Sequence, residues 1–300
     1  MDWYAAKIYG VFIQDRKEVG LMEAYPPLHE EPYPLQTRPL TIVDKDGNIL
    51  VWYLPRILFE DRQMAIFNST STLEPELAKS FTPEKTSWRT RRSSFLDGKM
   101  PGCINMSPAW FQQGHEWYRN ELEVSSLLKP TNKNIEENIS WLHNMNVHFP
   151  IVNSIAQIMH PQQFRIGMEA IDKLHKDPSH LREGNTARTV LDAWHTPFSA
   201  LAVISNRSTP SHRDLQSPAK GLDVMVTTGT YRDAFMVLPG IGMELYFPPG
   251  TVVALSGSLI QHGVRCSEVD RVCLALYMRS AVHEKLELSP TSWSNLSHFA

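Results

Sequence analysis

The sequence predicts an α+β protein whose core is a β sandwich or jelly roll, with flanking helices and an extended N-terminal region. Three observations lead to this fold class. Proline is frequent before residue 40, apolar residues at helical spacing fill much of 134–176, and short apolar runs separated by turn residues occupy 198–278. Many short strands at close spacing are typical of a sandwich or jelly roll and not of a parallel βαβ fold.

Three parts of the chain are expected. Residues 1–100 are predicted to form an extension packed on the core, because closely spaced prolines favour extended chain that lies over a surface. Residues 101–288 are expected to form one β domain with helical support, and residues 289–300 a C-terminal tail.

A β-hairpin is the clearest element of the extension. The apolar runs 40–43 and 49–54 flank a turn sequence, Asp44-Lys45-Asp46-Gly47-Asn48. Two runs of strand-forming residues joined by Asp, Gly and Asn pair readily with each other, so the pattern predicts a hairpin here.

Helical spacing follows in three stretches, 108–128, 134–146 and 151–176. The last is the clearest, because its apolar residues recur at steps of three or four. Pro161 must break or kink it, since a proline inside a helix removes a backbone donor. We expect these helices to pack on the outside of the β core.

Short strands are predicted from about residue 196 to residue 279. Gly229, Pro239-Gly240, Gly250 and Gly257 separate apolar runs that are each long enough for one strand. The predicted strands are 198–205, 222–228, 235–238, 243–247, 251–255 and 272–278.

Composition excludes several classes of protein. Hydrophobic residues make up 42% and charged residues 20%, as in globular proteins. No apolar run approaches the roughly 20 residues of a membrane helix, and the N-terminus does not resemble a secretory signal. A soluble, intracellular protein is expected, with free thiols at Cys103, Cys266 and Cys273. A net charge of -3 means that nucleic acid could be held only by a local basic patch.

A candidate metal site begins at His212 and Asp214, which lie between two apolar β runs. His262 follows a later predicted strand and supplies a second imidazole. Two histidines and one carboxylate on one face of iron leave the other face open for a co-substrate and O2, as in non-haem Fe(II) oxygenases. His-X-Asp alone is weak, because His175-Lys176-Asp177 has the same pattern at the end of a helical stretch.

Arg271 lies at the head of the last predicted strand. A fixed guanidinium in this place could hold the distal carboxylate of 2-oxoglutarate through two parallel donors. The alternatives are a surface ion pair of Arg271 with Glu268 or Asp270, and a core role for His262.

Basic and aromatic residues alternate in 84–95. Arginines could clamp a nucleic-acid backbone while a tryptophan stacks on a base, although a solvated loop is the alternative. The residues concerned are Lys85, Trp88, Arg89, Arg91, Arg92 and Phe95.

These motifs together resemble the TET/JBP oxygenase domain, and most of all its fungal branch. The resemblance covers about 195–285. It rests on His212-Arg213-Asp214, Gly229-Thr230-Tyr231, Leu238-Pro239-Gly240-Ile241-Gly242, Pro249-Gly250-Thr251-Val252-Val253, His262, Arg271, Tyr277-Met278-Arg279 and Val282-His283. It implies a double-stranded β-helix that uses Fe(II), 2-oxoglutarate and O2 to hydroxylate a methylated base in DNA, of the 5-methylcytosine or N6-methyladenine type, and therefore a nuclear location.

The resemblance also implies residue roles. His212, Asp214 and His262 fall on the iron ligands, and Arg271 falls on the 2-oxoglutarate arginine. Further residues fall on contacts to the co-substrate (Arg207) and to the flipped base (His283). At position 217 the family often has Asn or Asp to read the base, whereas this chain has Ser217.

Two other functions stay open at this point. The departure at Ser217 and the acidic net charge are compatible with a 2-oxoglutarate oxygenase that acts on a small molecule or a protein side chain. An inactive β-barrel that has kept the motif as a binding module is the third possibility.

Overall fold

The computed structural model describes residues 20, 22–83, 87–112 and 121–299. Its strands, in chain order, are β1 (Leu35–Gln36), β2 (Leu40–Val43), β3 (Ile49–Leu54), β4 (Gly102–Met106), β5 (Ala200–Ser205), β6 (Thr209–His212), β7 (Asp223–Gly229), β8 (Ala234–Leu238), β9 (Met243–Tyr246), β10 (Val252–Leu255), β11 (His262–Cys266) and β12 (Arg271–Tyr277). The described strands form a seven-stranded sheet in the order β2-β3-β10-β7-β12-β5-β4 and a five-stranded sheet in the order β1-β9-β8-β11-β6.

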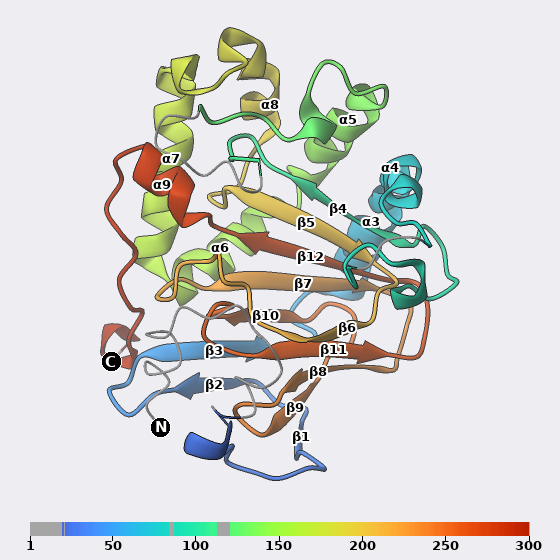
Figure 1. The fold of residues 1–300 in the computed structure, drawn as a ribbon, viewed down its shortest axis with the longest axis vertical. Coiled ribbons are helices and arrows are strands. Elements are labelled where there is room, and N and C mark those ends of the chain that lie inside the picture. Colours follow the sequence, from blue (N-terminus) through green and yellow to red (C-terminus); the bar gives the residue numbers. More distant parts are fainter. Residues whose placement is uncertain (1–19, 21, 84–86, 113–120, 300) are drawn as a thin grey trace.

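The described helices are α3 (Glu60–Ser69), α4 (Glu74–Lys79), α5 (Ile135–Met145), α6 (Phe149–Met159), α7 (Pro161–Lys176), α8 (Arg188–Ala193) and α9 (Ser280–Lys285). Short 3-10 helices are η1 (Thr70–Leu73), η2 (Arg92–Ser94), η3 (Ser126–Leu128), η4 (Pro178–His180), η5 (Gly184–Ala187) and η6 (Leu296–Phe299). Figure 1 shows α5, α7 and α8 at one end of the view and β8, β9 and β1 at the other. Among the described helices none is long and apolar enough to cross a membrane.

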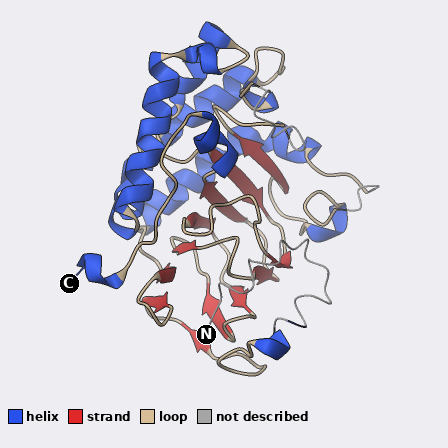
Figure 2. Ribbon diagram, turned by 60° about the vertical axis from the view of Figure 1, so that its left-hand side comes forward, coloured by secondary structure: helices blue, strands red, loops and turns tan. Residues whose placement is uncertain are grey.

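Three layers result from this arrangement. One apolar core lies between the two sheets and contains Met225 of β7, Val253 of β10 and Met236 of β8. A second core includes Val226 of β7 and Leu274 of β12 together with helical residues, so the opposite face of the larger sheet is covered by helices. Figure 2 shows these helices gathered on one side of the strands. The predicted α+β jelly-roll class is confirmed.

Most predicted elements are confirmed. The hairpin exists as β2 and β3, and β3 also pairs with β10, so part of the predicted extension lies within the larger sheet. All six predicted strands are present with ends shifted by a residue or two. The predicted break at Pro161 separates α6 from α7, because a proline is tolerated in the first turn of a new helix, where the His160 side chain accepts a bond from Gln163 N.

The α-helix predicted over 108–128 is wrong: in the described part of this range only Ser126–Leu128 are helical, as the 3-10 helix η3. Trp110 and Glu123 form a β bridge, each backbone N–H donating to the other residue's carbonyl at 3.0 and 2.9 Å. The apolar residues that suggested a helix, such as Leu122 and Val124, are buried in the core. The chain that carries them is not helical, so their spacing reflects contact with the core and not a helix. Residues 113–120 lie outside the described part of the chain.

Pattern analysis missed two strands that matter for the site, β6 and β11. β6 is the edge strand of its sheet, and its sequence Thr-Pro-Ser-His has no apolar alternation. An edge strand needs ladder bonds on one side only, so it tolerates Pro210. The segment expected as a tail packs against the hairpin, where Ile49 N donates to Ser294 O at 2.9 Å.

Candidate metal centre and co-substrate pocket

Strand pairing brings the two histidines together. β6 and β11 are antiparallel, and His212 is the direct partner of His262. Directly paired residues point to the same face of a sheet, and the two imidazole rings lie 4.5 Å apart between centroids. Asp214 follows two residues after His212, and its N–H donates to Gly257 O at 2.8 Å, which turns the chain beside the rings.

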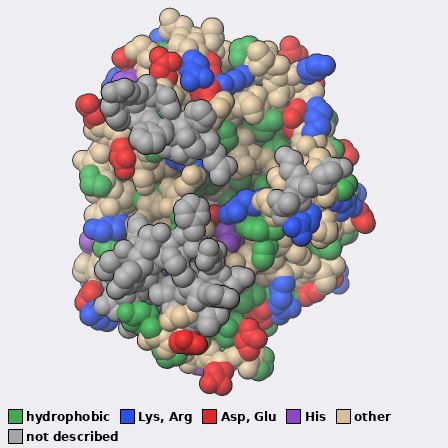
Figure 3. Space-filling view, in the orientation of Figure 1, with side chains coloured by type: hydrophobic (Ala, Val, Ile, Leu, Met, Phe, Trp, Pro, Cys, Tyr) green, Lys and Arg blue, Asp and Glu red, His purple; other side chains and the backbone are tan. Residues whose placement is uncertain are grey.

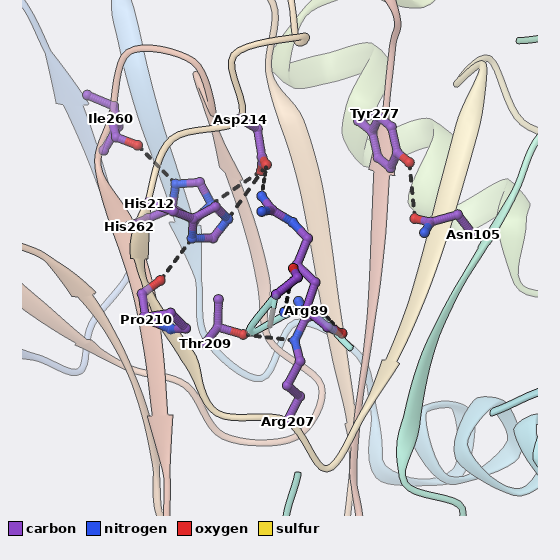
Figure 4. A network of polar contacts seen from close by, with 11 residues as sticks. Arg89, Asn105, Arg207, Thr209, Pro210, His212, Asp214, Ile260, His262 and Tyr277 are labelled. Atoms are coloured by element: carbon purple, nitrogen blue, oxygen red, sulfur yellow. Dashed lines mark hydrogen bonds and ion pairs between the residues drawn. The ribbon is translucent and has the colours of Figure 1, made fainter. Parts of the chain in front are cut away.

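Backbone carbonyls orient both imidazoles. His212 Nδ1 lies 3.0 Å from Pro210 O, and His262 Nδ1 lies 2.9 Å from Ile260 O. Because a carbonyl only accepts, each Nδ1 carries the proton and each Nε2 keeps its lone pair. Both Nε2 atoms lie 3.6 Å from an Asp214 carboxylate oxygen, as Figure 4 shows.

These three residues are the one group among the described His, Cys, Asp and Glu side chains whose ligand atoms could hold a metal, all within 4.8 Å of one another. Burial opposes a charge on Asp214, but the two imidazoles beside it outweigh burial and hold the pKa of Asp214 well below its usual value. Burial lowers the pKa of His212; at His262 burial acts the same way, but Asp214 outweighs it and raises the pKa. A charged carboxylate with two imidazoles fits Fe(II).

The competing His175-Lys176-Asp177 motif does not form such a group in the described residues. His175 Nδ1 lies 3.7 Å from Asp192 Oδ1, and Asp177 accepts a bond from Ser179 N at 3.1 Å. The motif ends α7, and Asp177 starts the next turn as a capping residue. The motif therefore ends one helix and caps the next.

Two buried arginines lie on the link between β5 and β6 and at the start of β12. Arg271 is 2% exposed, so the alternative of a surface ion pair is wrong. Its guanidinium donates to Arg207 O, and its Nε has no hydrogen-bond partner among the described residues. Arg207 is also buried, and burial lowers its pKa. No ion pair among the described residues includes either arginine, so this pair of buried cations fits an anionic ligand.

The basic, aromatic stretch lies against the metal centre, which sequence patterns did not indicate. The Trp88 ring meets the His212 ring edge-on, with centroids 4.9 Å apart. Arg89 stacks on Trp88 at 4.3 Å and donates to Asp214 Oδ1 at 3.4 Å. On the same indole ring lies the Arg207 guanidinium, 4.9 Å from its centroid. Figure 4 shows the Arg89 guanidinium beside Asp214, and Arg207 farther from Asp214 and next to Thr209.

The other basic residues of this stretch differ in their surroundings. Arg92 donates to Phe95 O at 2.7 Å and pairs with Asp97, so it holds its own loop together. Arg91 is exposed, and Lys85 lies outside the described residues. In Figure 3 Lys and Arg side chains lie next to a histidine near the middle of the view.

Two further predicted residues are buried. His283 on α9 is 5% exposed, so the alternative of an exposed polar residue is wrong. Its Nε2 has no hydrogen-bond partner among the described residues, and burial lowers its pKa to about 4. Ser217 is linked to the metal centre, because its N–H donates to Asp214 O at 3.0 Å.

Asp223, at the first position of β7, was missed by the sequence patterns. It lies near Asp214 and His262, and burial raises its pKa to about 8, assisted by Asp214. A polar residue at the start of an otherwise apolar strand was the available signal.

Comparison with known proteins places this fold and site in a class. The class is the 2-oxoglutarate- and Fe(II)-dependent dioxygenases, since the matching description is the oxygenase domain of the 2OGFeDO superfamily. The match is to the Tet_JBP family over residues 109–280, more than half of the chain, and the chain belongs to this family. The resemblance found in the sequence is thereby confirmed, and so are Fe(II) and 2-oxoglutarate as cofactors.

Solved structures are similar in fold at low sequence identity. NgTET1 in complex with 5mC DNA is 10% identical with a TM-score of 0.51, and the alignment covers 90% of this chain and 93% of that chain. A weaker likeness is to a full-length Neurospora crassa protein solved in complex with alpha-KG and thymine. It is 12% identical with a TM-score of 0.37, covering 79% of this chain and 87% of that chain. No curated protein matches the sequence.

Proposed function

We propose that the protein hydroxylates a methyl group on a methylated base in DNA, of the 5-methylcytosine or N6-methyladenine type. The observation that carries this proposal is the position of the Trp88-Arg89 pair on His212 and Asp214. An aromatic ring and a cation beside the metal centre are groups that bind bases and phosphates. Membership of the Tet_JBP family and the fold shared with NgTET1, solved with 5mC DNA, support it.

In this proposal His212, Asp214 and His262 hold Fe(II) through two Nε2 atoms and one carboxylate oxygen. Arg271 binds the distal carboxylate of 2-oxoglutarate, and Arg207 gives a second contact to the co-substrate. When bound, the iron and 2-oxoglutarate supply the oxidation: O2 is consumed, 2-oxoglutarate becomes succinate and CO2, and one oxygen atom enters a substrate C–H bond. The protein positions the reactants and excludes water.

The methyl group of a base in a duplex is shielded, so the base would be flipped out of the stack before reaction. Arg89 and Arg91 would contact phosphates, and His283 and Ser217 would lie on the side of the base. A role in DNA demethylation, and with it a nuclear location, follows from such a substrate.

The proposal is tested with oligonucleotides that carry 5-methylcytosine or N6-methyladenine, incubated with Fe(II) and 2-oxoglutarate and analysed by mass spectrometry. Wild-type protein is expected to form hydroxylated product and succinate. His212→Ala is expected to form neither, because the iron would lose one of its three protein ligands. His175→Ala is the matched control and is expected to behave as wild type. Undiminished turnover in His212→Ala would show that the metal assignment is wrong.

A second candidate is an oxygenase of a small molecule, which the short side chain of Ser217 and the net charge of -3 favour. Succinate formation that is stimulated by a metabolite extract and not by any methylated oligonucleotide would select this candidate.

A further inference from the structure

Asn206 links the two buried arginines, because it directly precedes Arg207 in the chain and pairs with Arg271. It follows the last residue of β5 and is 1% exposed. Its backbone lies in the left-handed region, with a φ of 54°. Residues other than glycine are uncommon there, although asparagine is enriched, and such backbone strain is concentrated at functional sites. The contacts that Asn206 makes must offset this strain.

The side chain of Asn206 takes the place of a backbone carbonyl in the larger sheet. β12 and β5 pair as far as Val272 with Ser205. One step further, Asn206 N donates to Arg271 O at 2.8 Å, whereas Arg271 N donates to the side-chain Oδ1 of Asn206 at 3.0 Å. In a regular antiparallel pair both of these bonds join backbone groups. The amide oxygen therefore completes a pairing that the left-handed turn would otherwise interrupt.

The remaining polar groups of Asn206 hold the loop that follows η2. Leu96 N donates to Asn206 O at 2.7 Å, and Asn206 Nδ2 donates to Lys99 O at 2.6 Å. Gly98 leaves room for this contact, because a Cβ added there would lie 2.7 Å from Asn206 Nδ2. Every hydrogen-bonding group of Asn206, on the backbone and in the side chain, therefore has a partner.

These contacts fix Arg271 at both ends. Its backbone N–H is bound by the Asn206 side chain, and its guanidinium donates to the carbonyl of the next residue, Arg207. Asp270, which precedes Arg271, is also left-handed with a φ of 61°, and its Oδ1 accepts from Lys99 N at 3.0 Å. A group that binds a ligand must be held within roughly 0.5 Å of its productive position. The place of the buried guanidinium therefore depends on the backbone that Asn206 holds.

We propose that Asn206 is a positioning residue for the co-substrate. Its side chain holds Arg271 where the guanidinium binds the distal carboxylate of 2-oxoglutarate, so the asparagine acts through Arg271 and not on the co-substrate itself. A purely structural role would lower stability without changing which 2-oxo acid is preferred. This inference rests on the proposed function, because the role of Arg271 is taken from there.

The test compares two ligands by calorimetry on protein loaded with Mn(II): 2-oxoglutarate, and 2-oxobutyrate, which lacks the distal carboxylate. Wild type is expected to prefer 2-oxoglutarate on the order of 100-fold, because only this ligand makes the bidentate charged contact. Asn206→Gly keeps the left-handed backbone and removes the amide. It is expected to lower the preference roughly tenfold, about what one buried hydrogen bond contributes. The affinity for 2-oxobutyrate is expected to stay as in wild type.

Asn138→Ala is the matched control, because it removes the bond of another buried asparagine to a backbone carbonyl, Leu127 O at 2.8 Å. It is expected to lower the Tm and to keep the preference for 2-oxoglutarate. Asn206→Ser is the second variant in case glycine prevents folding. Its hydroxyl is one bond too short to reach the Arg271 N–H, so the preference is expected to fall in the same direction.

A double variant separates positioning from a general loss of structure. In an Arg271→Met background the preference is already lost, so adding Asn206→Gly is expected to change the affinity for 2-oxoglutarate no further, because residues that act through one contact are not additive. Wild-type preference in both Asn206→Gly and Asn206→Ser, or an equal loss of affinity for the two ligands, would overturn the inference and leave Asn206 a structural support. Wild-type preference in Arg271→Met would overturn the role of Arg271 in the proposed function, and this inference with it.

Discussion

The metal centre and the two buried arginines, Arg207 and Arg271, differ in whether their buried polar groups have partners within the chain. At the metal centre each histidine Nδ1 has a carbonyl within 3.0 Å, and the carboxylate of Asp214 contacts both rings. At Arg207 and Arg271 two buried guanidinium groups repel each other, and no salt bridge in the described part of the chain includes either of them. A buried charge is stable only when it is paired. The charges of the first region are therefore balanced within the chain, whereas the second carries positive charge that an anionic ligand would neutralise.

Arg271→Met gives the largest effect that separates the two regions. Loss of the guanidinium is expected to raise the KM for 2-oxoglutarate on the order of 100-fold, because a bidentate charged contact is lost. Succinate formation measured against 2-oxoglutarate concentration gives this constant, and Fe(II) binding should stay as in wild type. Arg265→Met, which removes an exposed partner of Glu244, is the control. An unchanged KM in Arg271→Met would mean that the pocket does not bind the co-substrate.

His283 extends the comparison to stability, because it is a buried histidine without the carboxylate that His262 has. Its pKa of about 4 lies below the ordinary value, so protonation favours the unfolded chain. This contribution is fully present above about pH 6.5 and is lost as the pH falls toward 4, amounting to roughly 2 kcal/mol between pH 7 and pH 5. Urea unfolding at both pH values measures it.

In His283→Gln the loss of stability between pH 7 and pH 5 is expected to be smaller than in wild type by that amount. His143→Gln, on the exposed side of α5, serves as control and should retain the full loss. The same pH dependence in wild type and His283→Gln would place the titrating group elsewhere.

The smallest effect concerns the arginines of the 87–92 loop. Removal of Arg89 or Arg91 is expected to weaken binding of a methylated duplex only several-fold and to reduce the slope of log affinity against log salt by about 0.9 per lost phosphate contact. Arg92→Ala is the matched variant, because its guanidinium is paired with Asp97 and should leave the slope unchanged. Fluorescence anisotropy at several salt concentrations measures both. A slope that is equal in all variants would remove this loop from the DNA interface.

Local patterns predicted the elements with strong apolar periodicity. The hairpin at β2 and β3, α7, and strands such as β7 and β12 carry enough apolar residues to mark them. β6 carries Thr209 and Pro210 instead, and its strand character comes from pairing with β11. Pairing between distant segments has no local signature, so this strand could not be read from its own residues.

By itself the sequence determined which functional groups are present: two histidines, a carboxylate and an arginine, in an order that resembles the TET/JBP oxygenases. Only the tertiary structure decided which groups meet. It joined His212 to His262 across two strands, placed Trp88 on His212 and Arg89 on Asp214, and buried Asp223 behind Gly257. The physical reason is that residue identity fixes charge and hydrogen-bonding capacity, whereas burial and partners, which set pKa and reactivity, depend on contacts between residues far apart in the chain.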